Sequence, residues 1–207
     1  AVTFARSRNI DGPYETHPIK HILTAKDAPL NAVQRAGHGD IVDTPYGKTY
    51  LVHLMGRPTT QKRRCVLGRE TGIQEAYWGA DDWLWVKNGP VPSLEVEVPG
   101  ERDDTGYWAE QRYDFGAGLH KDFQWLRTPE TDRIFATVGG KLRLIGRESI
   151  GSWFEQGLVA RRQTHFSYDA EVTVEFSPTD ERQYAGLTGY YSRYNFHYVT
   201  VTAHSDG

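Results

Sequence analysis

Three short motifs in the first third of the chain place a histidine or an arginine beside glycine, where an apolar or β-branched stretch ends. The motifs are Gly37-His38-Gly39, Gly56-Arg57-Pro58 and Gly68-Arg69-Glu70. Glycine lets a backbone turn sharply or approach a ligand closely, and the imidazole or guanidinium group beside it can meet a polar oxygen. Their occurrence in so short a stretch predicts strands that converge on one polar cavity.

His38 and Arg69 are the strongest candidates for binding. His38 lies two positions before Asp40, so in an extended strand both side chains would point to the same face. A neutral imidazole can ligate a metal directly or through water, and calcium sites rich in water need few protein ligands. Arg69 can hold hydroxyl groups or orient a carboxylate, because it keeps its proton. The alternatives are a structural histidine and an ion pair of Arg69 with Glu70 or Asp40.

Other catalytic chemistry finds no support in the sequence. The serines lack a Gly-x-Ser-x-Gly elbow, and there is no His-Glu-x-x-His, phosphate loop or dinucleotide fingerprint. The single cysteine, Cys65, excludes an internal disulfide and a site built from several thiolates, and it is predicted to be a buried structural thiol. Paired carboxylates leave no local spacing signature in a β fold, so sequence spacing does not reveal a general acid and base.

Composition narrows the classes of partner. The 207 residues carry 24 Lys and Arg against 27 Asp and Glu, with the signs interspersed, which argues against nucleic acid. No apolar run approaches the roughly 18 residues of a membrane span, and no signal-peptide pattern opens the chain. Together with the single cysteine this favours the cytoplasm, with secretion left open. The aromatic residues, 13% of the chain, suit small β cores or the apolar faces of sugars.

The pattern of apolar residues favours strands and turns, with almost no helical periodicity. A strand is expected over 2–6. Two hairpins are predicted, residues 40–44 with 48–54 and residues 72–78 with 83–86, each across a glycine-containing turn. Hairpins at this spacing are typical of propeller blades.

Residues 88–104 are rich in proline and glycine and are predicted to link two domains. Beyond them, short alternating strands predict an antiparallel sandwich. The chain begins within a strand and stops at Ser205-Asp206-Gly207, a turn that would precede a returning strand, so we expect a piece of a longer polypeptide. The strands of the second half are expected over 124–127, 133–137, 141–145, 154–163, 170–176, 185–191 and 196–202.

Several motifs in order resemble glycoside hydrolase family 43. They are residues 5–15, the Ala-Gly-His-Gly of 36–39, the His-Leu-Met-Gly-Arg-Pro of 53–58 and the Leu-Gly-Arg-Glu-Thr of 67–71. The most similar type is the two-domain β-xylosidase, which often also has α-L-arabinofuranosidase activity. Its C-terminal sandwich is resembled by residues 123–127, 146–149, 158–163 and 185–191. The resemblance covers nearly the whole chain.

The resemblance implies an all-β fold, with the last blades of a five-bladed β-propeller followed by an incomplete concanavalin-like antiparallel β-sandwich. Residues 1–99 would complete the catalytic propeller and its linker, and residues 100–207 would begin the sandwich. The implied reaction is hydrolysis of β-1,4-xylo-oligosaccharides from the non-reducing end, with inversion. Inversion needs an acid and a base about 6.5–9.5 Å apart, so that water fits between them.

The resemblance places no catalytic carboxylate in this chain. The Asp base, the Glu acid and the Asp that tunes the acid belong to blades that precede Ala1. His38 corresponds to a histidine near the propeller axis, beneath the sugar, which in some members helps bind calcium through water. Arg69 corresponds to an arginine that contacts the sugar and the acidic residues. Met55 stands where many relatives carry Thr.

The expected partners follow from the same resemblance: a xylo-oligosaccharide, the remaining segments of the enzyme as other chains, and further copies in a homo-oligomer. Neither nucleic acid nor a membrane is expected, and the chemistry requires no cofactor, calcium being structural. Alone, the chain should be inactive. Two alternatives stay open, an α-L-arabinofuranosidase of the same fold and a non-catalytic carbohydrate-binding module, which would show an aromatic-lined sheet face.

Overall fold

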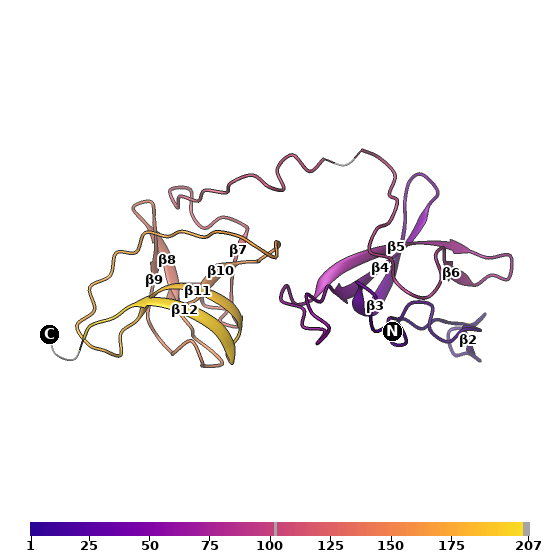
Figure 1. Ribbon diagram of the computed structural model, residues 1–207, viewed down its shortest axis with the longest axis horizontal. Coiled ribbons are helices and arrows are strands. Elements are labelled where there is room, and N and C mark those ends of the chain that lie inside the picture. The colour runs from indigo at the N-terminus through magenta and orange to yellow at the C-terminus, as the bar shows by residue number, and fades with distance from the viewer. Residues whose placement is uncertain (102, 205–207) are drawn as a thin grey trace. The chain divides into compact units, whose positions relative to one another are not determined.

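The computed structural model describes residues 1–101 and 103–204, and the chain divides into two compact units, Ala1–Asp103 and Asp104–Gly207. Both units are built from β-strands, as predicted (Figure 1). Within the described residues, the 3-10 turn η1 (Thr131–Arg133) is the one helical element. No helix in the described part of the chain is long and apolar enough to span a membrane.

The first unit contains a four-stranded antiparallel sheet in the order β3-β4-β5-β6, the arrangement of a propeller blade (Figure 1). Both predicted hairpins are confirmed. The strands begin earlier than predicted, β3 at Gln34 and β5 at Glu70, because Gly37 of the first motif and Glu70 of the third are themselves paired with β4. The four strands are β3 (Gln34–Asp43), β4 (Thr49–Gly56), β5 (Glu70–Trp78) and β6 (Leu84–Val86).

The N-terminal segment lies against this sheet. It forms the small hairpin of β1 (Ala5–Arg6) and β2 (Glu15–Thr16), and a single antiparallel bridge joins Val2 to Leu23. The strand predicted over 2–6 is therefore present only in part, since residues 3 and 4 pair with no strand.

A hydrophobic core joins the N-terminal segment to the blade. Alternation along each strand directs one set of side chains to this face. The fully buried Leu51 of β4 belongs to this core, and the partly buried Phe4 and Ile41 pack against it. The buried members are Val2, Ile22, Leu23, Ala36, Leu51, Ala76, Leu84 and Val86.

Polar contacts fix the N-terminal hairpin on β6. Arg6 donates from Nη1 to the Asp81 carbonyl at 2.6 Å, and its guanidinium lies 4.0 Å from the Trp83 ring centre. The buried His17 places Nε2 3.1 Å from the Leu84 carbonyl. Because a buried imidazole nitrogen needs a partner, this hydrogen bond also fixes which nitrogen carries the proton.

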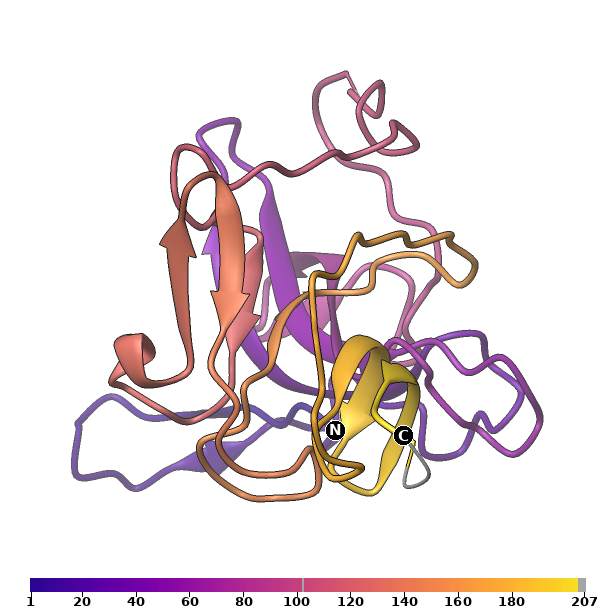
Figure 2. The same ribbon diagram turned by 90° about the vertical axis from the view of Figure 1, so that its left-hand side faces the viewer.

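The second unit consists of three separate strand pairs, β7 with β10, β8 with β9, and β11 with β12. The long β11–β12 ribbon is strongly curved (Figure 2). The strands are β7 (Phe123–Trp125), β8 (Phe135–Val138), β9 (Lys141–Leu144), β10 (Val159–Arg161), β11 (Ala185–Ser192) and β12 (Asn195–Val201).

Two strand predictions for this unit were wrong. The strand expected over 154–163 is reduced to β10, and residues 170–176 form no strand although their apolar residues alternate. Alternation predicts a strand only where a neighbouring strand supplies hydrogen bonds and a second layer covers the apolar face. Neither is present in the described residues, and Val172 is 52% exposed. The turn predicted at Ser205-Asp206-Gly207 lies outside the described residues.

Candidate functional site

The sheet brings the three glycine-flanked motifs to one end of the blade. In the ladders Gly37 pairs with Leu54 and Leu54 with Thr71, so the start of β3, the end of β4 and the start of β5 lie side by side. His38 follows Gly37 directly, and Arg69 lies two residues before Thr71. The convergence follows from the antiparallel register rather than from any long loop.

Two successive β-bulges interrupt β3 where it meets β4. One lies between Gln34 and Gly37 and the other between Gly37 and Asp40. Arg35 and His38, one in each bulge, have left-handed φ values of 57° and 51°. Such conformations cost a non-glycine residue of the order of 1–3 kcal/mol and persist where the surrounding structure imposes them, often at functional sites. The bulges mark this end of the blade as a candidate site.

The bulge changes how His38 relates to Asp40. The expectation that both side chains share one face assumed an extended strand, and that assumption was wrong, because the left-handed residue breaks the alternation. Both side chains are exposed, and Asp40 Oδ1 accepts the Ile41 backbone N–H at 2.8 Å. In the described part of the chain no hydrogen bond joins the two, so Asp40 does not orient the imidazole.

Glu70 and Arg57 form the best-defined ion pair at this end of the blade. Arg57 Nη2 donates to Glu70 Oε1 at 2.7 Å, and Nε lies 3.1 and 3.2 Å from the two carboxylate oxygens. The Glu70 side chain is only 17% exposed. This fork-like contact ties the residue after β4 to the first residue of β5, directly beside Arg69. Arg69 itself is exposed and has contacts of its own.

His53 packs inside the blade. It is 2% exposed, and its Nδ1 donates to the Leu54 carbonyl at 3.0 Å, while Nε2 is buried without a partner in the described structure. Gly72 lies opposite, and a Cβ there would come within 2.9 Å of the ring. Desolvation lowers the pKa of His53, against the opposing effect of the Leu54 hydrogen bond. The ring is therefore neutral and structural.

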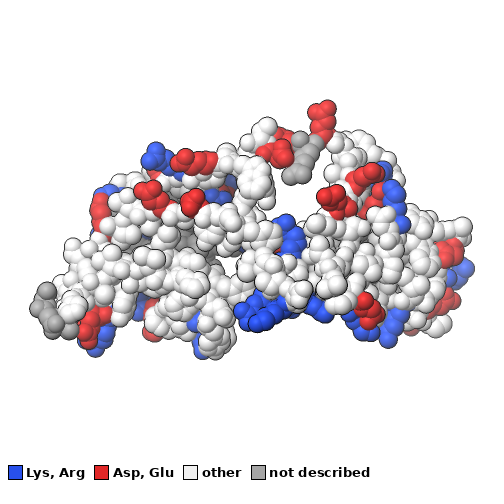
Figure 3. Space-filling model, in the orientation of Figure 1, with Lys and Arg blue, Asp and Glu red and all other residues white. Residues whose placement is uncertain are grey.

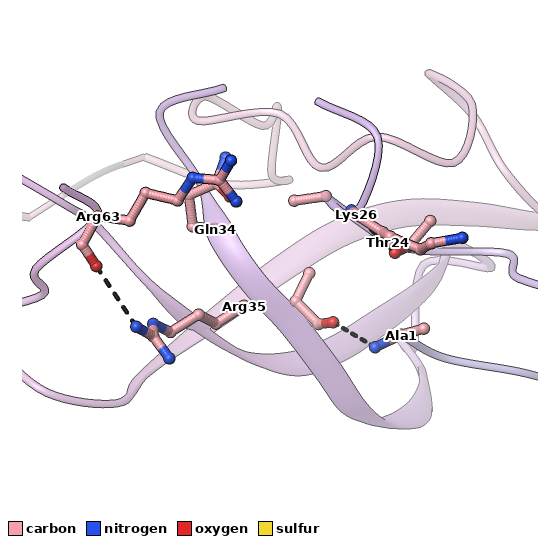
Figure 4. Close-up of a pocket in the computed structure, with 8 residues that line it drawn as sticks. Ala1, Thr24, Lys26, Gln34, Arg35 and Arg63 are labelled. Carbon is pink, nitrogen blue, oxygen red and sulfur yellow. Dashed lines mark hydrogen bonds between the residues drawn. The ribbon is translucent and has the colours of Figure 1, made fainter. Parts of the chain in front are cut away.

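Basic side chains gather over the loop between β4 and β5 (Figure 3). A pocket of about 350 Å³ lies beside the first bulge, lined by Lys26, Gln34, Arg35 and Arg63 among others. Arg35 reaches across it and donates from Nη2 to the Arg63 carbonyl at 3.4 Å (Figure 4). Cys65 ends the basic stretch and is buried, which confirms the prediction of a structural thiol.

The described residues do not build a metal site by themselves. They contain no group of three or more His, Cys, Asp or Glu side chains placed to hold an ion. A divalent cation needs several donors, and the ordinary calcium ligands are carboxylate and carbonyl oxygens. His38 could contribute only beside ligands from elsewhere, so calcium bound through water stays a prediction.

The sequence identified the three glycine-flanked motifs but did not predict how they pack in the sheet. The Arg57–Glu70 pair was not predicted, although the hairpin register, in which Met55 lies opposite Glu70, brings Arg57 near that carboxylate. The bulges were also missed, since the only local signal is the pair of glycines around His38.

Comparison with protein families matches both parts of the chain. Residues 1–84 match the model "Glycosyl hydrolases family 43", and residues 112–207 match "Beta xylosidase C-terminal Concanavalin A-like domain".

Individual relatives agree with these matches. The chain is 77% identical over its whole length to "Xylosidase/arabinosidase 43B" of Humicola insolens, and 40% identical over 98% of its length to "Beta-xylosidase" of Bacillus subtilis. The crystal structure of xylan beta-1,4-xylosidase from Bacillus halodurans superimposes with a TM-score of 0.84 at 38% identity, covering 99% of this chain. The chain spans 39% of the first protein and 40% of each of the other two.

Proposed function

Because the chain belongs to glycosyl hydrolase family 43, we propose that it is the middle part of an exo-acting β-xylosidase that releases xylose from the non-reducing end of β-1,4-xylo-oligosaccharides. The proposal rests chiefly on the 77% identity to the xylosidase/arabinosidase of Humicola insolens. The all-β fold of the chain, and the position of its glycine-flanked motifs at one end of a blade, agree with this proposal.

In the proposed reaction this chain binds and positions the sugar, and carboxylates from preceding blades carry out the chemistry. A protonated Glu there gives its proton to the leaving oxygen, while an Asp takes a proton from the water that attacks the anomeric carbon from the opposite side. The configuration therefore inverts. No step passes through a metal.

Arg69 is assigned to the terminal sugar. Its guanidinium can donate to two neighbouring hydroxyl groups, or to a hydroxyl and a carboxylate together. The Arg57–Glu70 pair fixes the backbone next to it, so Arg57 and Glu70 act as positioning residues.

His38 is assigned to the floor of the proposed sugar-binding site. The left-handed backbone at this residue places the imidazole out of the regular strand alternation, which suits a group that must reach a ligand.

The full-length enzyme provides the test. Digestion of xylotriose should give xylose and xylobiose first, and proton NMR during the first turnovers should show the α-anomer of xylose, since β-linkages are inverted. Release of the β-anomer, or an aryl α-L-arabinofuranoside cleaved much faster than the aryl β-xyloside, would contradict the proposal, the second result favouring the arabinofuranosidase alternative.

We also propose that the working enzyme combines this chain with the remaining segments and assembles as a homo-oligomer. The chain covers only part of the length of each relative, which supports the combination with further segments. Intact mass under denaturing conditions, followed by light scattering of the native sample, tests both.

A further inference from the structure

Three segments of the second unit meet in an exposed cluster of arginine and aromatic side chains. Arg193 lies with its guanidinium carbon 4.1 Å from the ring centre of Trp153 and 4.5 Å from that of Tyr194. Arg127 lies 5.4 Å from the same Trp153 ring. We call these four residues, Arg127, Trp153, Arg193 and Tyr194, the Trp153 cluster.

The backbone around the cluster is fixed by hydrogen bonds. Arg127 Nη1 donates to the Trp153 carbonyl at 3.2 Å, and the backbone N–H of Glu155 donates to Thr128 Oγ1 at 3.1 Å. Two of these residues, Arg127 and Glu155, hold left-handed φ values of 56° and 55°. These hydrogen bonds thus hold the backbone at Arg127 and Glu155 in an unfavourable conformation, in which the Trp153 indole lies at the surface.

The turn between β11 and β12 holds the other side of the cluster. Ser192 Oγ accepts the Tyr194 backbone N–H at 3.3 Å and the Asn195 side-chain amide at 3.2 Å, next to a register shift in the ribbon. The turn therefore places Arg193 and Tyr194 in a set position.

Two of the rings are accessible to a ligand, since Trp153 is 54% exposed and Tyr194 is 71% exposed. Trp, Tyr and Arg are the residues that dominate binding hot spots, and this cluster joins all three types.

We propose that the Trp153 cluster is a carbohydrate-binding site for a β-1,4-xylan chain. Every hydroxyl of a xylopyranose unit in such a chain is equatorial, so its axial C–H bonds form two flat apolar faces. The exposed indole of Trp153 covers one face, and the Tyr194 ring can cover the next unit. The two guanidinium groups donate to hydroxyl and ring oxygens along the edge. The choice of xylan rests on the proposed function, whereas the aromatic and arginine geometry does not.

Affinity electrophoresis of the full-length enzyme through gels containing soluble β-1,4-xylan tests this proposal. Trp153→Ala should weaken retardation by about tenfold, the scale of a well-placed aromatic contact. Trp153→Phe keeps a ring and should retain most of the binding, and Arg193→Ala should fall between them. Trp108→Ala is the matched control, because Trp108 is 77% exposed in the same unit and contacts other residues.

The outcomes separate this proposal from the proposed function. Aryl β-xyloside hydrolysis is measured in parallel, so an enzyme that lacks this activity but binds xylan through Trp153 would overturn only the proposed function. Equal retardation of wild type and Trp153→Ala would overturn the carbohydrate site. So would a change of oligomeric state in Trp153→Ala and Trp153→Phe without a change in retardation, because the cluster would then be a protein interface.

Discussion

The blade of β3–β6 and the strand pairs of residues 104–207 differ in what covers their apolar side chains. Among the described residues every fully buried hydrophobic side chain except Ile134 lies in Ala1–Asp103. In the second unit the apolar residues of β12 stay open to solvent, with Val199 78% exposed. Strands of a sandwich bury their faces against a second sheet, so this unit needs further strands to acquire a core, whereas the blade builds one with the N-terminal segment.

The largest expected effect is on the blade core. Replacement of the fully buried Leu51 by Ala should lower the free energy of unfolding by about 2–5 kcal/mol, because it opens a cavity among side chains that cannot collapse. The same change at Leu187 of β11, which is 40% exposed, should cost no more than about 0.5 kcal/mol. Urea denaturation of the two variants measures both. Equal losses would mean that the two units are packed alike.

A smaller loss of stability is expected when a glycine of the second unit is replaced by alanine. A Cβ at Gly186 of β11 would overlap the Val199 carbonyl of the paired strand, so Gly186→Ala should open the β11–β12 ladder at a cost of about 1–3 kcal/mol. Gly146→Ala is the control, since a Cβ there meets nothing. Hydrogen exchange followed by mass spectrometry should show faster exchange in β11 and β12 for the first variant alone. Unchanged protection in Gly186→Ala would show that the ribbon adjusts without loss.

The stability of the blade should depend on pH through His53. Burial lowers its pKa below the ordinary value of 6.5. As pH falls below 6.5, the unfolded chain takes up a proton that the folded chain does not, so stability decreases until the lowered pKa is passed. His53→Gln should flatten this dependence of the melting temperature, and the exposed His197→Gln should not. A wild-type curve that is flat below 6.5 would contradict a neutral, buried His53.

The smallest effect concerns Glu75, whose pKa is lowered by hydrogen bonds from Lys87 at 2.8 Å and Lys48 at 3.2 Å. A carboxyl with a lowered folded pKa stabilises the protein above the unfolded value of 4.5, and this contribution is lost as pH falls through the folded pKa. Glu75→Gln should therefore lose less stability than wild type below 4.5. Glu175→Gln, which removes the exposed ion pair with Lys141, should leave the loss of stability below pH 4.5 unchanged.

The same comparison explains what sequence could predict. Alternation and turn residues located both blade hairpins, because those strands find their partners nearby in the chain. Residues 170–176 carry an equally clear alternation yet form no strand, since the pattern does not state whether a partner is present. At the candidate site the glycines pointed to His38 and Arg69, but the bulges at 34–40 and the Arg57–Glu70 pair depend on register and on contacts between separate strands.

Removal of the Arg69 side chain tests the central claim most directly, namely that this end of the blade binds the sugar. In the full-length enzyme, Arg69→Ala should lower kcat/KM for an aryl β-xyloside by about a hundredfold, the loss expected when a group that orients the reacting sugar is removed. Arg64→Ala, an exposed arginine in the same loop, should stay within about twofold, the range of substitutions without a role in the transition state. Equal activities of the two variants would contradict the placement of the binding site at this end of the blade.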